Sequence, residues 1–266
     1  VIINNKCAKL YIDSITSCYQ DSRKIDLCDV KISDKTDKTD IFGEDENVSD
    51  IDGSELISKE VFNTYGHDRF KGVVNVSQFN RNNLRALFRN SSILKQSVKK
   101  MGKLDFLKGK IIGLYFNEPS SRTYASFYVA VKKLGGDVIS LNDSNSSSKK
   151  GESLYDTIKC MESYCDLVVI RTSSKDSLEE LQNRIKIPII NAGDGDGEHP
   201  TQALLDVFTI REERGTVNKT VVSIVGDLKY GRTVHSLVRL LSNYSITFNF
   251  VSIEELSLDN NTISYL

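Results

Sequence analysis

The feature that most constrains this chain is a regular alternation of strand-like and helix-like segments after about residue 70. Short apolar runs such as KIIGLYF, DLVVIR and IPIINAG alternate with helix-like segments such as SFYVAVKKLGG, ESLYDTIKCMESY and HPTQALLDVFTIREERG. Parallel strands need crossover connections, and these are usually helices. The alternation therefore predicts an α/β fold in which helices cover a parallel sheet. Just before it, Leu84, Leu87 and Phe88 share one face of a predicted amphipathic helix.

A second unit is predicted to begin after the last of these helices. The segments TVVSIVGD, RTVHSLVRLLSNY and ITFNFVS predict a strand, a helix and another strand. Two strands and one helix cannot bury both faces of a parallel sheet, so they form about half of a doubly wound domain. We expect two doubly wound parallel-sheet domains, 69–211 and 212–266, of which the second is incomplete in this chain.

Residues 1–68 are predicted to form an extension before the first domain. Lys31–Glu55 is rich in Asp, Ser, Lys and Thr and poor in apolar residues, so burial cannot offset the entropy of ordering it. We interpret this segment as a linker or solvated extension, partly low-complexity or disordered. The first thirty residues carry scattered Leu, Ile and Tyr, and their periodicity does not decide whether they form a short helix.

Composition excludes several classes of protein. The chain has 35 basic and 36 acidic side chains, so its overall charge attracts neither nucleic acid nor an anionic membrane. No apolar run approaches the roughly 18 residues of a membrane span, and the first residues lack a secretory signal, so we expect a cytoplasmic protein. Because the first residue is Val rather than Met, removal of a targeting sequence stays an alternative. Its five cysteines show no zinc-ligand spacing and are interpreted as reduced structural thiols.

The strongest local motif follows the first predicted strand. Residues 117–123, NEPSSRT, join this strand to an apolar helix. Hydroxyls at the turn, free backbone N–H groups at the helix start and the guanidinium of Arg122 offer a phosphate several donors. An ordinary serine N-cap beside a solvated arginine explains the same residues equally well, so the motif alone does not decide.

Three further polar clusters have similar positions. The serine-rich loop Asn142–Glu152 ends in paired lysines that could close over an anion, although a solvated surface loop is the favoured interpretation. Arg171 ends a strand at the edge where open α/β sheets bind ligands, but a solvated strand-end arginine is a comparable alternative. His199 and Gln202 lie after another strand, and both side chains can contact a carbonyl or an amide.

A last basic turn, Gly226–Arg232, joins a strand to a helix in the second unit. Its Lys229, Tyr230 and Arg232 could hold a carboxylate, and a solvated turn is a comparable interpretation. The other two histidines, His67 and His235, are interpreted as structural.

These clusters, in this order and at these intervals, resemble the aspartate carbamoyltransferase family from near Asn75 to near Ser252. The family's Ser-x-Arg-Thr signature matches Ser120, Ser121, Arg122 and Thr123, with Ser121 where many members carry threonine. Its mobile Ser/Lys loop matches Ser146 and Lys150, and its His-Pro-x-Gln signature matches His199, Pro200, Thr201 and Gln202. The segment GDLKYGRTVHS resembles the aspartate-specific members more than the ornithine-specific branch.

The resemblance implies a carbamoyltransferase fold, and transfer of a carbamoyl group from carbamoyl phosphate to L-aspartate, an early step of de novo pyrimidine biosynthesis. It implies that Ser120, Ser121, Arg122 and Thr123 hold the phosphate, that Arg171 bridges phosphate and carbonyl, and that His199 and Thr123 polarise the carbonyl oxygen. Gln202 would take the carbamoyl amide, and Arg232 and Lys150 would contact aspartate. Ser146 and Lys150 would act from a neighbouring subunit of a homotrimer. This route needs no cofactor and no metal, and neither nucleic acid nor membrane is an implied partner.

The chain also departs from the family. Its three prolines are Pro119, Pro188 and Pro200, so the Leu-Pro segment that closes over the carbamoyl group in the family is absent, as is the family's final helix. We therefore expect a fragment or an incompletely represented chain, catalytically poor by itself. An ornithine carbamoyltransferase and a catalytically inactive scaffold remain as alternatives. A nucleotide-binding module ranks last, because neither a G-x-G-x-x-G nor a P-loop motif occurs.

Overall fold

The computed structural model describes residues 26–31, 72–142, 151–173, 177–195 and 197–266. The chain divides into two compact units, one formed by 46–204 and the other by 1–45 together with 205–266. The division falls within helix α7 (Pro200–Arg214), slightly before the boundary between 211 and 212 suggested by the sequence. Each unit is described by itself.

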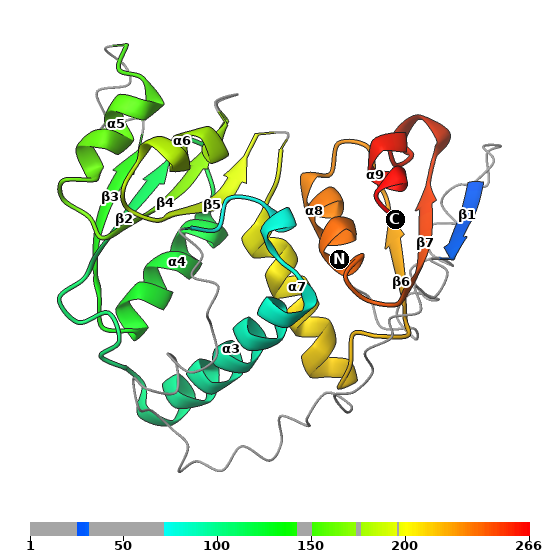
Figure 1. Cartoon of the computed structure of the whole chain (residues 1–266), viewed down its shortest axis with the longest axis horizontal. Coiled ribbons are helices and arrows are strands. Elements are labelled where there is room, and N and C mark those ends of the chain that lie inside the picture. Colours follow the sequence, from blue (N-terminus) through cyan, green and yellow to red (C-terminus); the bar gives the residue numbers. More distant parts are fainter. Residues whose placement is uncertain (1–25, 32–71, 143–150, 174–176, 196) are drawn as a thin grey trace. The chain divides into compact units, whose positions relative to one another are not determined.

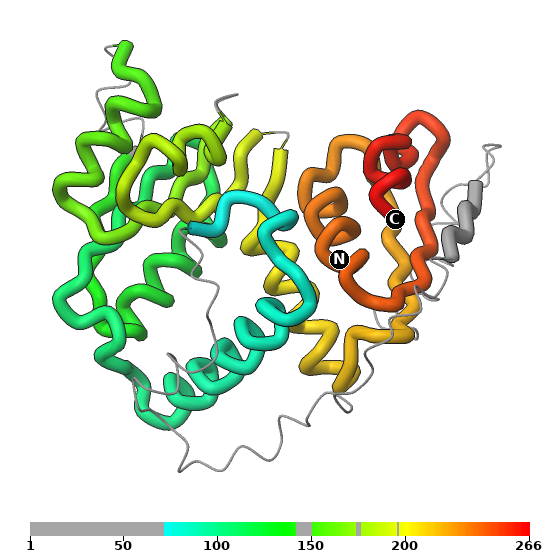
Figure 2. Tube along the Cα trace, in the orientation of Figure 1, coloured from blue at the N-terminus to red at the C-terminus, as the bar shows by residue number. Residues whose placement is uncertain are grey.

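The first unit is built on a four-stranded parallel sheet with the strand order β3-β2-β4-β5 (Figure 1). Its strands are β2 (Ile111–Phe116), β3 (Asp137–Asn142), β4 (Leu167–Thr172) and β5 (Ile189–Asp194), and its helical elements are η2 (Val76–Gln78), α3 (Arg81–Met101), α4 (Ser121–Lys133), α5 (Leu154–Met161) and α6 (Leu178–Arg184), before α7. The predicted alternation and the predicted parallel sheet are both confirmed. Figure 2 follows the path of the same chain through these elements.

Both faces of this sheet are covered, as a doubly wound fold requires. Side chains alternate along β2, so Ile112, Leu114 and Phe116 form one core cluster with Val131 of α4. Tyr115 points to the opposite face, where it joins a second cluster that contains Leu154 and Ile158 of α5 and Leu178 and Leu181 of α6. The two clusters together explain why β2 is a nearly continuous apolar run rather than an alternating one.

Helix α3 confirms the predicted amphipathic helix. Leu84 and Phe88 are buried and Leu87 is half-buried, so the predicted apolar face does face the protein. Asn80 caps the start through a reciprocal pair of hydrogen bonds with Asn83. Gly102 ends the helix with φ 77, a conformation that strongly favours glycine.

The second unit contains the predicted strand, helix and strand as β6 (Thr220–Val225), α8 (Arg232–Leu241) and β7 (Ile246–Ser252). Strands β6 and β7 are parallel, and β1 (Asp26–Lys31) adds to β7 in the antiparallel sense, giving the order β1-β7-β6. The tail forms η4 (Glu254–Leu256) and α9 (Asn260–Ser264). Strand β1 was not predicted, because six residues whose partner lies more than 200 residues later leave no local signal.

No helix within the described part of the chain is long and apolar enough to cross a membrane.

The two cysteines of the first unit with described side chains are expected to differ in reactivity. Burial raises the pKa of the Cys165 thiol, and the charge of neighbouring Asp166 raises it further, so little thiolate forms there at pH 8. Cys160 is exposed on α5. Iodoacetamide at pH 8 should therefore alkylate Cys160 well before Cys165, as measured by timed peptide mass spectrometry. Equal rates in the folded protein would contradict this expectation, and denatured protein is the control in which the difference should vanish.

Candidate active site

The turn from β2 to α4 has the geometry of an anion site. The backbone N–H of Asn117 continues the ladder to the carbonyl of Arg171 at 2.8 Å, and Ser120 then precedes the helix in an extended conformation. Ser120 occupies the N-cap position without a side-chain capping hydrogen bond, which differs from an ordinary serine N-cap, whereas Arg122 is exposed as that alternative expects. The first N–H groups of α4 have no acceptor within the helix. Ser121 and Arg122 are exposed beside them, and Thr123 is half-buried.

Arg171 is buried, with only 9% of its surface exposed, so the alternative of a solvated arginine is wrong. Within the sheet, Arg171 of β4 pairs with Phe116 of β2. On the other side of β4, the register with β5 shifts between Ile170 and Thr172. Such irregularities re-aim a side chain at a sheet edge. The guanidinium donates from Nη2 to Glu118 Oε1 at 2.6 Å and from Nη1 to the carbonyl of Ala192 at 3.2 Å.

The Nε of Arg171 is buried and has no hydrogen-bond partner among the described residues. An unpaired donor on a buried cation is costly unless a ligand satisfies it. The Arg171 side chain also reaches from the β2–α4 turn to β5, so it lies where three neighbouring strands end. This position favours an anion as the missing partner.

His199 is 6% exposed and lies immediately before α7. Its Nδ1 is 3.4 Å from the backbone nitrogen of Gln202 and 3.3 Å from the hydroxyl of Thr201. Because a backbone N–H can only donate, Nδ1 acts as the acceptor and the neutral ring carries its proton on Nε2. Nε2–H is then the donor of the ring. Gln202 is half-buried in the first turn of the same helix.

Three of the predicted clusters therefore gather at one edge of one sheet. Ser120–Thr123 follow β2, Arg171 is the next-to-last residue of β4, and His199–Gln202 follow β5; these strands are neighbours in the order β3-β2-β4-β5. Ser146 and Lys150 lie outside the described residues, as does His67. The functional roles of all these residues stay predictions.

Arg232 belongs to the second unit, where it starts α8 and is half-buried. The turn before it is closed by Asp227 Oδ1, which accepts the N–H groups of Lys229 and Tyr230 at 3.1 and 2.9 Å. His235 Nε2 lies 2.9 Å from the carbonyl oxygen of Leu228, which agrees with its predicted structural role.

Glu118 is the residue of this edge that the sequence did not single out. It stands within the recognised NEPSSRT turn, but only the fold reveals that its carboxylate meets Arg171 from 53 residues away. The one available signal was a carboxylate between a strand end and Pro119. Its contact with Arg171 shows that this edge already binds one anionic group.

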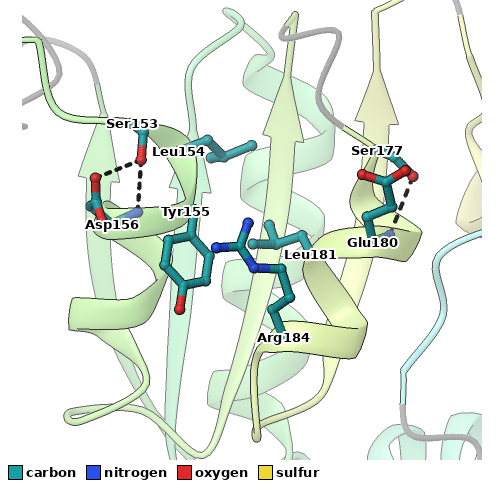
Figure 3. A pocket seen from close by; sticks show the side chains of 8 residues that line it. All are labelled: Ser153, Leu154, Tyr155, Asp156, Ser177, Glu180, Leu181 and Arg184. Atoms are coloured by element: carbon teal, nitrogen blue, oxygen red, sulfur yellow. Dashed lines mark hydrogen bonds between the residues drawn. The ribbon is translucent and has the colours of Figure 1, made fainter.

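Of two hollows on the first unit, the smaller one borders the β2–α4 turn and contains Ser120 and Ser121 of the predicted residues, but not Arg122, Thr123, Arg171, His199 or Gln202. It measures about 300 Å³ and is lined by Phe116, Glu118, Pro119, Ser120, Ser121, Tyr124, Ser140 and Leu141. The larger, about 470 Å³, lies between α5 and α6 and contains none of the predicted residues (Figure 3). There Arg184 is stacked 3.7 Å over the Tyr155 ring, and Ser153 and Ser177 cap their own helices. These groups are already engaged with one another, so the larger hollow offers no sign of the predicted chemistry.

In the described ranges, no group of three His, Cys, Asp or Glu side chains is placed to hold a metal ion.

Comparisons with known proteins agree with this geometry. Residues 71–212, more than half of the chain, match a family model described as aspartate/ornithine carbamoyltransferase, carbamoyl-P binding domain. The multifunctional protein pyr1-3 of Dictyostelium discoideum is 53% identical over 196 residues, covering 74% of this chain and 9% of that protein. The multifunctional protein CAD of Squalus acanthias is 46% identical over 194 residues, again covering 9% of its length.

Solved structures give a similar result. Aspartate transcarbamoylase from Trypanosoma cruzi, in complex with aspartate and phosphate, has a TM-score of 0.69 and 41% identity, covering 73% of this chain and 63% of that chain. The catalytic subunit of M. Jannaschii aspartate transcarbamoylase has a TM-score of 0.69 and 40% identity, covering 73% and 64%. The chain thus spans less than two thirds of these structures and about a tenth of the multifunctional relatives. On the family match, and on the fold that it shares with these enzymes, the chain belongs to the aspartate/ornithine carbamoyltransferase family.

Proposed function

We propose that this chain supplies the carbamoyl phosphate site of an aspartate carbamoyltransferase, with 69–211 as the carbamoyl phosphate-binding domain and 212–266 as part of the aspartate-binding domain. The observation that carries the proposal is the buried guanidinium of Arg171, whose Nε has no hydrogen-bond partner within the described part of the chain, at the edge where the β2–α4 turn and His199 also lie. A small phosphorylated ligand would satisfy that donor.

In this proposal the phosphate is held by donors from two elements. Ser120, Ser121, Arg122 and Thr123 offer hydroxyls, a guanidinium and helix N–H groups, and Arg171 approaches from β4. Because Arg171 already pairs with Glu118 at 2.6 Å, the phosphate has to compete with this carboxylate. Binding is therefore an exchange of one anion for another at a buried cation.

The carbamoyl group would be oriented by the start of α7. His199 Nε2–H and the Thr123 hydroxyl donate to the carbonyl oxygen, and the Gln202 side chain takes the carbamoyl amide. The aspartate nitrogen then forms a bond to the carbonyl carbon, and negative charge develops on the oxygen facing these donors. The bond from carbon to the phosphate oxygen breaks, phosphate leaves with the electron pair, and the amine proton passes to phosphate or solvent. This chemistry requires no metal or organic cofactor.

The aspartate side of the site is proposed on weaker grounds than the phosphate side. Arg232 contacts a carboxylate of aspartate, and Lys150 assists it, with Ser146 and Lys150 supplied by a neighbouring subunit. The basic turn Lys229–Arg232 suits a dicarboxylate better than the cationic side chain of ornithine. The T. cruzi structures, whose descriptions name aspartate and carbamoyl phosphate together, support the same choice by similarity.

A homotrimer is proposed because apolar side chains remain uncovered near this site. Tyr128 and Val129 of α4 are 42% and 52% exposed, and Ile139 of the sheet-edge strand β3 is 36% exposed. Large exposed apolar side chains can mark an interface between chains. A second and a third copy of the chain would cover them and bring Ser146 and Lys150 to an adjoining site.

The test is to measure carbamoyl aspartate and carbamoyl ornithine side by side, by mass spectrometry, with the full-length protein that contains this chain. We expect carbamoyl aspartate to form at least about 100-fold faster, because a site built to pair with a carboxylate discriminates strongly against a substrate that lacks it. Preferential formation of carbamoyl ornithine would establish the ornithine alternative. Binding of carbamoyl phosphate without either product would favour an inactive scaffold.

A further inference from the structure

The turn that carries His199 is anchored to a segment far away in the sequence. Val73 forms a parallel bridge with Ile190 of β5, and Figure 2 shows the start of the described range 72–142 running beside the strand. Glu198 makes the most distant contact, since its Oε2 accepts the backbone N–H of Val76 at 2.7 Å across 122 residues. The segment around Val76 and the start of α7 are thereby connected by a single side chain.

Glu198 is also fixed through its own backbone. Its N–H donates to Asp194 Oδ1, and the Asp194 N–H donates back to the Glu198 carbonyl at 3.3 Å. Asp194 in turn accepts the side-chain amide of Asn191, which is fully buried and also donates to the carbonyl of Val74. Glu198 thus has both its main chain and its side chain held, and only one peptide bond separates it from His199.

The hydrogen bond from the Val76 N–H depends on the length of the Glu198 side chain rather than on its negative charge. Val76 is 2% exposed, so its N–H needs an acceptor inside the protein. A glutamine at position 198 would offer a side-chain oxygen at the same distance from the backbone. An aspartate would keep the charge but withdraw the oxygen by one methylene group.

We propose that Glu198 is a positioning residue for His199, holding the imidazole where Nε2–H meets the carbonyl oxygen of the carbamoyl group. The inference rests on the proposed function. Ser120, Arg122 and Thr123 belong to a different element, so loss of the Glu198 contact displaces the carbonyl donor without removing the phosphate donors. The effect falls on turnover rather than on capture of carbamoyl phosphate.

The experiment compares Glu198→Gln and Glu198→Asp in the full-length protein, measuring kcat for carbamoyl aspartate formation, KM for carbamoyl phosphate and the melting temperature. We expect the glutamine variant to keep kcat within about twofold and the aspartate variant to lose about 10- to 100-fold, since a displacement near 1 Å can cost that much. KM for carbamoyl phosphate should change by less than about threefold in both variants, in keeping with the unaltered phosphate donors.

Glu179→Ala is the matched control. Glu179 Oε2 accepts a hydrogen bond from the side-chain amide of Asn75 at 3.2 Å, so this carboxylate contacts the same segment as Glu198 does. Glu179 belongs to α6, however, and not to the turn that carries His199. Its kcat should equal that of the unsubstituted protein. Equal losses in Glu179→Ala and Glu198→Asp, a loss in Glu198→Gln as large as that in Glu198→Asp, or no loss in either Glu198 variant would each overturn the inference. Absence of product from the unsubstituted protein would instead overturn the proposed function, so the two failures are distinguishable.

Discussion

Arg122→Ala is expected to weaken carbamoyl phosphate binding by at least about 100-fold while leaving the melting temperature unchanged. Arg122 is exposed at the first turn of α4, where its guanidinium can make two charge-assisted hydrogen bonds to a phosphate. Bonds to charged groups contribute about 1.5–3 kcal/mol each, and every 1.4 kcal/mol changes affinity tenfold. Calorimetry with carbamoyl phosphate measures the loss directly.

The melting temperature of Arg122→Ala should not change, because the Arg122 side chain is exposed. Substitutions at exposed positions without special contacts usually change the free energy of unfolding by less than about 0.5 kcal/mol. Arg85→Ala is the matched control, because Arg85 is an exposed arginine on α3, outside the β2–α4 turn. Its carbamoyl phosphate affinity should be unchanged. Near-normal affinity in Arg122→Ala would refute the assignment of the phosphate to this turn.

Arg171→Leu is expected to affect both turnover and folding. Turnover should fall by about 10³-fold or more, because the variant loses a cation that faces the developing charge. The free energy of unfolding should fall by about 2 kcal/mol, because two hydrogen bonds from a charged donor are lost and Glu118 remains half-buried without its partner. Denaturant titration and steady-state kinetics measure the two effects separately.

The double variant Arg171→Leu with Glu118→Gln separates stability from function. Removing the negative charge at position 118, which has then lost its ion pair with Arg171, should recover about half of the lost stability but none of the turnover. Arg184→Leu is the control, since this arginine stacks on Tyr155 in the larger hollow and should be replaceable with little loss of activity. Recovery of turnover in the double variant would show that Arg171 acts only by neutralising Glu118.

The sequence predicted the parts of this molecule that depend on local pattern. The alternation of apolar runs predicted β2 to β7 and the helices between them, because each such segment signals its own periodicity. The strand order β3-β2-β4-β5 was not predicted, since periodicity does not say which strands are neighbours. The antiparallel addition of β1 to β7 was missed for the same reason.

The candidate site was predictable to a similar degree. The sequence suggested that Ser120–Thr123, Arg171 and His199 follow strands, and the fold brings these strands together at one edge. It left open whether Arg171 is solvated, because the shift in register near Ile170 and the contact with Glu118 arise only from pairing between distant segments. The role of Glu198 as an acceptor for Val76 was hidden in the same way.

The pairing of Glu118 with Arg171 also bears on which anions the proposed site would admit. The fold holds this carboxylate 2.6 Å from the guanidinium, so its effective local concentration is on the order of millimolar or higher. Chloride or a free monocarboxylate has to displace this built-in competitor with no additional contacts in return. A doubly charged phosphate ester that also engages the hydroxyls beside Arg122 gains enough to do so. If the proposed function holds, the carboxylate of Glu118 would select against common cellular anions before the reacting carbonyl is positioned.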